Sequence, residues 1–199
     1  PDALLEQVFS ILCRAVAPIA QFETLAADEK HVILKPRGAS LARPGFGEPW
    51  TKPGDIFLPI LRRTSRGGQL VENGIQVVPW TFLEVVNDKA GQSSDTIARI
   101  HSGTRRPFGA RRQGRVEQVA LAMRSDPAPT ALRIHSRIAK DKPLVGYEVF
   151  AQTDPQKPDS LTRLGTTGRD GMLEVPPAEQ RVRLLILKHG GHLLARVPV

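Results

Sequence analysis

The chain has 199 residues, of which 40% are hydrophobic and 24% are charged, and its formal net charge is +8 with an isoelectric point near 10.2. This composition excludes wholesale disorder, and the length allows one sizeable core or two modest ones. The 17 glycines and 17 prolines favour a mainly β protein, because proline lacks the N–H donor that a helix needs and glycine weakens helices.

The charge, the cysteine content and the apolar runs set further limits. A basic chain is suited to a polyanionic partner such as nucleic acid, acidic glycan or anionic lipid, but a solvated basic surface explains the charge equally well. The single cysteine, Cys13, excludes an intramolecular disulfide and a cysteine-rich metal site. No apolar run approaches the roughly 20 residues that cross a bilayer, so we expect no membrane span. The chain starts at Pro1, which suggests a processed protein or a piece of a longer one.

Residues 2–22 predict one amphipathic helix. Apolar side chains recur there at helical spacing, Asp2 is a suitable N-cap, and Pro18 should kink or end the helix. Its apolar side needs a partner, which is most simply the sheet that follows.

From His31 onward the sequence predicts short strands separated by glycine and proline turns. Strands so short and so closely spaced are typical of a small β-barrel or a half-open β-roll. Trp80 lies between two of these segments, and we expect it in the core, whereas Trp50 in the long loop 39–53 is a candidate exposed anchor. The expected strands are 31–35, 56–62, 74–78, 81–86, 96–100 and 116–123.

Residues 99–115 contain six arginines and no acid, and glycines and a proline interrupt them. Such a segment buries no face of its own, so we expect an exposed loop. Guanidinium groups bind phosphate and carboxylate, which makes the loop a candidate polyanion-binding site, although Phe108 is its only aromatic for stacking on bases. The alternative is a solvated loop, or one packed on another part of the protein. The candidate residues are Arg99, Arg105, Arg106, Arg111, Arg112 and Arg115.

Residues 125–129 are rich in Pro and polar residues and predict a linker, so we place a helix and barrel module at 1–125 and a second module at 126–199. The second module alternates apolar and polar residues in six or seven strands, two of which are 161–166 and 172–175, and this number is typical of an antiparallel β-sandwich. Its last two strands flank His189-Gly190-Gly191-His192, which we interpret as a glycine hairpin and not as a metal site.

Two motifs of the second module resemble carboxypeptidase-regulatory-like, or transthyretin-like, domains. They are Pro143-Leu144-Val145-Gly146-Tyr147-Glu148-Val149 and the glycine-rich run from Leu164 to Pro176. In such domains a P-L-x-G-x-x-V strand precedes a G-x-T-x-x-x-G-x-x-x-V-P hairpin, whose turn requires the positive φ that Asp170-Gly171 supplies. The resemblance implies an accessory module of a secreted or envelope protein. The hydroxyisourate hydrolases of this sandwich class end in Tyr-Arg-Gly-Ser, and this chain ends differently.

The first module faintly resembles the β-barrels of periplasmic flagellar-assembly proteins, in which a Gly-Asp turn launches a strand, as Gly54-Asp55 does here. No nucleophile elbow, Walker loop, dinucleotide fingerprint or zinc-protease helix is present, and we expect no enzyme, cofactor or metal. The leading hypothesis is a non-enzymatic binding or structural module of a periplasmic or extracellular multidomain protein, whose partners are other proteins or other domains of a longer polypeptide. Polyanion binding through residues 99–115 is the alternative, followed by a hydrolase whose residues meet only in space.

Overall fold

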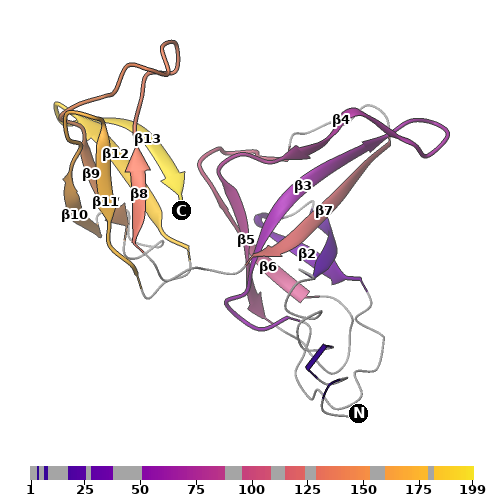
Figure 1. Cartoon of the computed structure of the whole chain (residues 1–199). Helices are drawn as coiled ribbons and strands as arrows, with labels where there is room; N and C mark the ends of the chain where they lie inside the picture. The colour runs from indigo at the N-terminus through magenta and orange to yellow at the C-terminus, as the bar shows by residue number, and fades with distance from the viewer. Residues whose placement is uncertain are drawn as a thin grey trace. The chain divides into compact units, whose positions relative to one another are not determined.

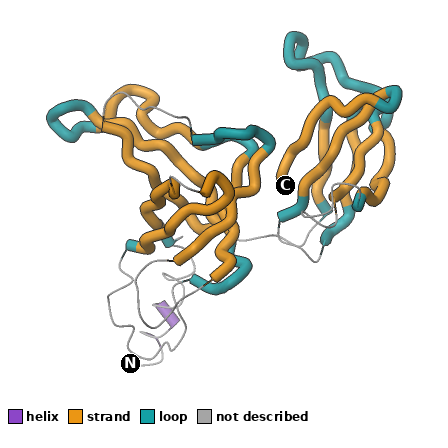
Figure 2. The backbone as a smooth tube through the Cα atoms, turned by 180° about the vertical axis from the view of Figure 1, so that it is seen from behind, coloured by secondary structure: helices purple, strands orange, loops and turns teal. Residues whose placement is uncertain are grey.

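The computed structural model describes Leu4, residues 7–8, 18–25, 28–37, 51–87, 96–108, 115–123, 129–152, 160–178 and 182–199. These residues form thirteen strands, and strands account for 64% of the interpretable structure. The mainly β prediction is therefore confirmed. The chain divides into two compact units, one of Pro1–Ile100 with Arg106–Arg124 and the other of His101–Arg105 with Ser125–Val199. We call them the barrel unit and the sandwich unit; Figure 2 shows that strands dominate both.

The barrel unit contains seven strands in one sheet of order β4-β3-β5-β6-β2-β1-β7. An additional pairing of β3 with β7 runs from Ile56↔Met123 to Thr64↔Arg115 and closes six of the strands into a barrel, with β4 as an extra strand on β3 (Figure 1). The small barrel expected from the sequence is thus confirmed. The strands are β1 (Ile19–Leu25), β2 (Asp28–Pro36), β3 (Ile56–Thr64), β4 (Leu70–Val77), β5 (Thr81–Asn87), β6 (Thr96–Ser102) and β7 (Arg115–Met123).

The barrel interior is filled by large side chains placed beside small ones. Phe57 faces Ala122 across the β3–β7 pair, and Val32 faces Ala98 across the β2–β6 pair. Small barrels commonly fill a narrow interior in this way. The buried core comprises Ala20, Phe22, Val32, Leu34, Phe57, Val78, Leu83, Val85, Ala98, Phe108 and Ala120.

The prediction of a helix over residues 2–22 is wrong for its C-terminal residues. Residues Ile19–Phe22 belong to strand β1, where buried Ala20 and Phe22 alternate with exposed Ile19 and Gln21. Pro18 ends any helical pattern, and the period of two then takes over because alternate residues enter the barrel. The described residues contain no helix as a complete element, although the backbone of Leu4, Gln7 and Val8 is helical. Of residues 2–17, only Leu4, Gln7 and Val8 are described, and the rest of the expected helix lies outside the described part. Accordingly, the described residues contain no helix that is long and apolar enough to span a membrane.

The sandwich unit has two sheets. One has four antiparallel strands in the order β10-β9-β12-β13, and the other pairs β11 with β8. Side chains from both sheets share one core, in which Val149, Ala151 and Leu185 of the first sheet meet Val175 of the second. This is a two-layer sandwich of six strands, and its likeness to transthyretin-like domains stays a prediction. The strands are β8 (Thr130–Arg133), β9 (Glu148–Gln152), β10 (Leu161–Thr166), β11 (Met172–Val175), β12 (Leu184–His189) and β13 (His192–Pro198).

The turn before β11 joins two different sheets. We expected β10 and β11 to form a hairpin, but β10 pairs with β9 and β11 with β8. Gly171 has the positive φ that the sequence predicted, +72°, and its amide donates to Gly168 O at 2.9 Å. A Cβ atom on Gly171 would lie 2.5 Å from Ile134 O, so this glycine also allows the turn to approach the end of β8.

We predict that Gly171→Ala destabilises the sandwich unit by about 2 kcal/mol or more, because a left-handed backbone conformation and a backbone collision oppose the added methyl group. Gly190→Ala is the matched control, since Gly190 has a φ of +56° and no atom lies within 4 Å of its added Cβ. The control should cost about 1 kcal/mol. Urea unfolding read by hydrogen exchange of the β8 and β11 amides measures both, and equal costs would contradict the close approach.

Candidate functional site

The six arginines of the sequence hypothesis do not lie on one exposed loop. Arg99 is half-buried within β6, opposite His31, and Arg115 is the exposed first residue of β7. Strands β2 and β1 separate β6 from β7 in the sheet. Arg105 and Arg106 are exposed in the turn that follows β6, and Arg106 Nη2 lies 3.2 Å from Glu29 Oε1. Arg111 and Arg112 lie outside the described residues.

Phe108 is not available for stacking on a nucleic-acid base. Its side chain is 7% exposed, and its ring centroid lies 4.8 Å from that of Phe22 in the barrel core. The ring therefore anchors the end of the turn that carries Arg105 and Arg106. Among the described residues of segment 99–115, Arg105 and Arg106 are the cations that are exposed outside the strands.

A network centred on Glu117 links three strands on the outside of the barrel. Its carboxylate accepts hydrogen bonds from Gln21 Nε2 at 2.7 Å and from Arg62 Nη1 at 3.0 Å, and it is paired with Arg37. The hydrogen bond from Gln21 and the adjacent Arg62 and Arg37 guanidiniums hold the pKa of Glu117 below its ordinary value. These partners come from β1, from β3 and from the residue that directly follows β2, so the network ties neighbouring strands together.

The two C-terminal histidines belong to a turn. His189 pairs with His192 across Gly190-Gly191, both of which have positive φ, so the predicted glycine hairpin is confirmed. His189 stacks on Tyr147 with ring centroids 4.5 Å apart. Within the described ranges, no group of three or more His, Cys, Asp or Glu side chains is placed to hold a metal ion.

The outer face of β4 exposes a row of large apolar side chains. Val77, Ile75 and Leu70 stand opposite Ile60, Arg62 and Thr64 of β3. These alternate β3 residues point away from the face that carries the core residue Phe57. Ile75 is 59% exposed and Val77 51% exposed. The row borders the buried Ile60, whose partner on the far side is Val119 of β7. We define the β4 outer surface as Leu70, Ile75, Val77 and Trp80.

Trp80 completes this surface from the turn between β4 and β5. Its side chain is 58% exposed, and its φ of +51° lies in the left-handed region that bulky residues avoid. Such a conformation costs on the order of 1–2 kcal/mol and is concentrated at functional positions. The turn is held by Val78, whose side chain is buried and whose amide donates to Pro59 O at 3.0 Å. Trp80 follows the exposed Val77 by three residues, and an exposed tryptophan together with exposed aliphatic side chains has the composition of a binding hot spot.

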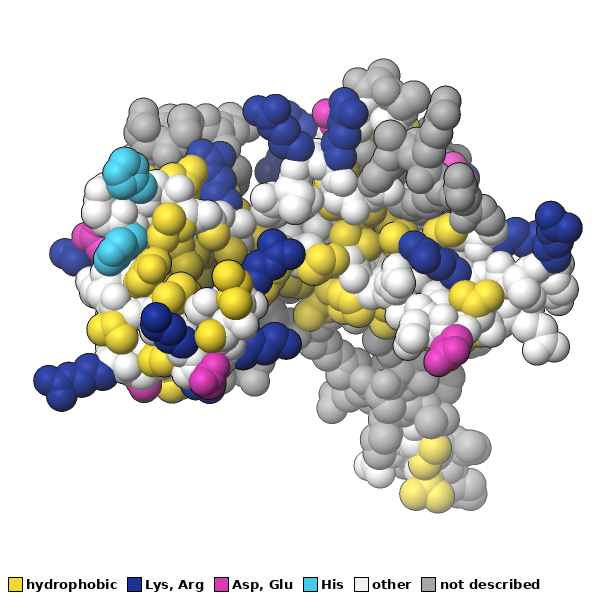
Figure 3. All heavy atoms as spheres, turned by 90° about the horizontal axis from the view of Figure 1, so that it is seen from above, with side chains coloured by type: hydrophobic (Ala, Val, Ile, Leu, Met, Phe, Trp, Pro, Cys, Tyr) yellow, Lys and Arg dark blue, Asp and Glu magenta, His cyan; other side chains and the backbone are white. Residues whose placement is uncertain are grey.

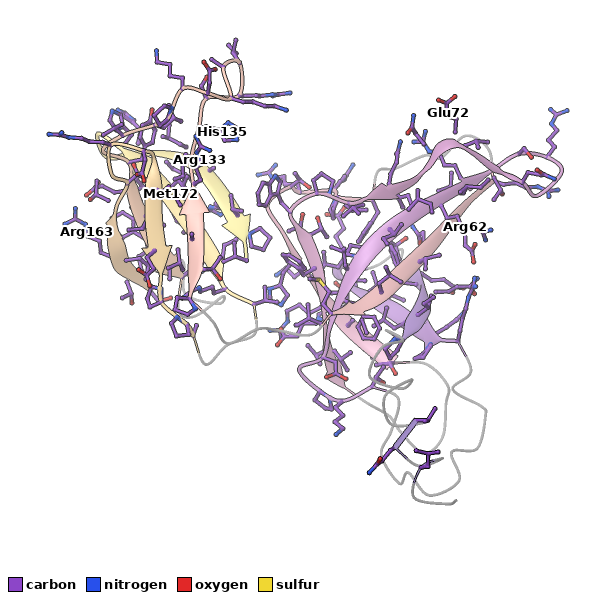
Figure 4. The ribbon with its side chains drawn as sticks, in the orientation of Figure 1. Arg62, Glu72, Arg133, His135, Arg163 and Met172 are labelled. Carbon is purple, nitrogen blue, oxygen red and sulfur yellow. The ribbon has the colours of Figure 1, made fainter. Side chains whose placement is uncertain are left out.

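Cations border the β4 outer surface. Arg62 stands directly opposite Ile75, and Arg66 is exposed in the turn that joins β3 to β4. Glu72 is the acid on β4 itself, and Figure 4 shows its side chain projecting from that strand, while Arg62 lies over β3 and β7. Figure 3 shows yellow apolar side chains with dark blue Lys and Arg among them on the exposed face of the barrel.

Sequence reasoning missed this surface. The pattern Ile75-Gln76-Val77 predicted a strand correctly, but alternation does not tell which of two faces enters the core. Trp80 was expected in the core and is exposed instead, because the Val78-Pro79-Trp80 segment turns where a strand was assumed to continue. Trp50, the other tryptophan, lies outside the described residues.

Comparisons with known proteins add no relative to this picture. No protein-family model matches the chain, and no curated protein or solved structure matches it significantly.

If Trp80 is retained for binding and not for folding, Trp80→Asn should change the free energy of unfolding by no more than about 1 kcal/mol, because relief of the left-handed strain offsets the lost contacts of the partly buried ring. Asparagine tolerates this backbone conformation better than other side chains do. Chemical denaturation of the barrel unit, followed by the near-ultraviolet circular dichroism of the full chain, makes the comparison. A loss of more than about 2 kcal/mol would show that Trp80 is a packing residue.

Proposed function

We propose that this chain is a non-enzymatic binding module of a periplasmic or extracellular multidomain protein, and that its barrel unit binds a protein partner through the β4 outer surface. The observation that carries the proposal is the exposed Trp80, held in a left-handed conformation in the turn that directly follows β4, the strand with exposed Ile75 and Val77. The sequence resemblance to accessory domains of secreted and envelope proteins supports the compartment.

The energetic argument favours an interface over a chance exposure. Burying one aliphatic side chain is worth about 1.5–3 kcal/mol, so a partner that covers Leu70, Ile75 and Val77 together with Trp80 gains free energy of this kind on binding. Exposed apolar side chains scattered singly need no explanation, whereas a contiguous group marks an interaction site. Leu70, Ile75 and Val77 stand on one face of β4, so they form a contiguous group.

The border of the surface defines the chemistry of the partner. Arg62 and Arg66 are exposed on the neighbouring strand and turn, and Arg62 keeps its ion pair with Glu117 at 3.0 Å. A complementary partner therefore has an apolar centre that meets Trp80 and carboxylates that meet these guanidiniums. Binding to such a partner should weaken as salt rises, since rim charges are screened.

A photo-crosslinking amino acid at position 75, in the full chain incubated with the envelope or secreted fraction of its own cells, tests the proposal. We expect a discrete crosslinked protein that is lost in the Trp80→Asn/Val77→Ser variant and decreases with salt. The matched control places the crosslinker at position 193, because Leu193 is comparably exposed on β13 of the sandwich unit.

The crosslinked product must also differ from a dimer of the chain, which sedimentation of the purified protein identifies. The proposal is rejected if position 75 yields nothing beyond what position 193 yields, or if the product persists in the Trp80→Asn/Val77→Ser variant.

Polyanion binding by residues 99–115 is a second candidate. It is favoured by the exposure of Arg105 and Arg106, which project from a turn anchored by buried Phe108. Because Phe108 is buried and cannot stack on a base, an acidic glycan is favoured over single-stranded nucleic acid.

For this candidate we expect late elution from a heparin column, and elution at clearly lower salt for Arg105→Ala/Arg106→Ala/Arg111→Ala/Arg112→Ala, since each contact with a polyanion adds to the salt dependence. The control removes the same charge elsewhere with Arg63→Ala/Arg66→Ala/Arg133→Ala/Arg169→Ala. If both quadruple variants elute together, retention reflects net charge and the segment is not a site.

A further inference from the structure

An ordered arm projects from one end of the sandwich unit between β8 and β9. The chain leaves the sandwich at His135 and returns at Pro143, and these two residues form an isolated antiparallel bridge. Below the bridge, Leu144 N donates to Ile134 O at 3.0 Å. Figure 1 shows this arm extending beyond the strands, and Figure 4 shows Arg133 and His135 at its base. We define the arm as residues 136–142.

Hydrogen bonds within the arm fix its shape. Ser136 N donates to Lys142 O, and Lys142 N donates to Ala139 O, both at 3.0 Å. The Ser136 hydroxyl accepts from the amides of Ile138 and Ala139 at 3.3 and 3.4 Å. The tip is therefore a preformed turn, and it needs little ordering when it binds.

The tip joins one fully exposed aliphatic side chain with three cations. Ile138 is 98% exposed, the most of any large apolar side chain among the described residues. Arg137, Lys140 and Lys142 are exposed around it, and Asp141 is the one acid of the arm. None of the three cations forms an ion pair with another residue of the described part.

The base of the arm adds further positive charge. Ile134 N donates to Gly171 O at 2.9 Å, which places the Gly168–Gly171 turn beside the arm. Arg133 and Arg169 are exposed there. The nearby acid, Asp170, accepts a hydrogen bond from Met172 N at 2.9 Å and so helps to hold the turn. Cations thus outnumber acids around the whole arm.

We propose that the 136–142 arm contacts the surface of an anionic lipid bilayer, with Ile138 inserted at the boundary between the headgroups and the acyl chains and Arg137, Lys140 and Lys142 held at the lipid phosphates. A bilayer supplies both chemistries within a few ångströms of depth: anionic headgroups attract each nearby Lys or Arg, and the hydrocarbon boundary buries the apolar side chain. Long Lys and Arg side chains keep their charges at the headgroups while their stems lie along the apolar boundary.

A bilayer fits the shape of the arm better than a folded partner or a soluble polyanion. A protruding tip needs a concave pocket on a protein, whereas lipids rearrange around an inserted side chain. A soluble polyanion satisfies the cations but leaves Ile138 in water. The arm lies in the sandwich unit and does not involve the β4 outer surface, so this inference is independent of the proposed protein partner.

Vesicle sedimentation with the full chain tests the inference. The probes are vesicles of phosphatidylcholine and vesicles with about 30% phosphatidylglycerol, which carries the surface charge that the cations require. We expect binding to the anionic vesicles only. Ile138→Ser should weaken that binding about tenfold, since the burial of one aliphatic side chain is lost. Lys140→Ser/Lys142→Ser should weaken it by a comparable or larger factor.

Two matched comparisons separate bilayer insertion from its alternatives. Leu193→Ser removes a comparably placed aliphatic group on β13 and should leave vesicle binding unchanged. Ile138→Ser should leave elution from heparin unchanged, because a soluble polyanion offers no apolar phase. Vesicle binding that is insensitive to Ile138→Ser, or absent from anionic vesicles, would overturn the inference. The chain already has Trp50 and Trp80, so the emission of the parent chain is subtracted from that of Ile138→Trp. The difference spectrum should shift to the blue with anionic vesicles, and an unshifted difference spectrum contradicts insertion.

Discussion

The pairing of β3 with β7 is the constraint on which the barrel unit depends. It joins β3 to β7, the last strand in the sheet order, over nine consecutive residue pairs, from Ile56↔Met123 to Thr64↔Arg115, and so pairs backbone groups along one edge of each strand. Because β7 occupies one whole edge of β3, the other edge is divided. Residues Ile56 and Phe57 pair with β5, and residues from Ile60 to Thr64 pair with β4. Closure therefore leaves β4 outside the barrel, with an outer face that no strand of the closed barrel covers.

The free edge of β4 is irregular, and this irregularity hinders β-strands of other chains from pairing with it. The register between β3 and β4 shifts between Arg62 and Thr64, so several β4 residues bulge out around Asn73 and Gly74. Asn73 has a φ of +52°, and a Cβ on Gly74 would lie 2.6 Å from Val71 O. Bulges of this kind blunt an edge strand and limit backbone pairing with other chains. Recognition at β4 consequently rests on its side chains and on the neighbouring Trp80.

The strands could be predicted from sequence because alternation and turn residues are local signals. β10 and β11 were predicted over the same residues that the structure gives, Leu161–Thr166 and Met172–Val175. The pairing of those strands could not be predicted, since the Thr167–Gly171 turn looks the same whether it closes a hairpin or crosses between sheets. The strand over Ile19–Phe22 was missed because Val16 and Ile19 satisfy a helical period as well as they satisfy the start of a strand. Trp80 was misplaced because Pro79 and Trp80 form a turn between β4 and β5, where the sequence pattern was interpreted as part of a strand.

The arginine segment shows how folding redistributes a composition signal. In the sequence, Arg99 and Arg115 are the first and last residues of one basic segment. In the barrel they lie on β6 and β7, which are separated by β2 and β1. The net charge of +8 then acts as a general field that attracts anionic partners without selecting among them. Selection requires geometry that combines charge with apolar area, and two described places combine them: Ile75, which stands opposite Arg62 on the strand that leads to Trp80, and Ile138, which shares its turn with Lys140 and Lys142. Each is held by hydrogen bonds or a buried neighbour, Val78 in the first and Ser136 in the second, so the exposed groups are presented in fixed positions. Side chains that are exposed in fixed positions lose little conformational entropy when they bind, and this distinguishes the two places from the basic side chains on the rest of the surface.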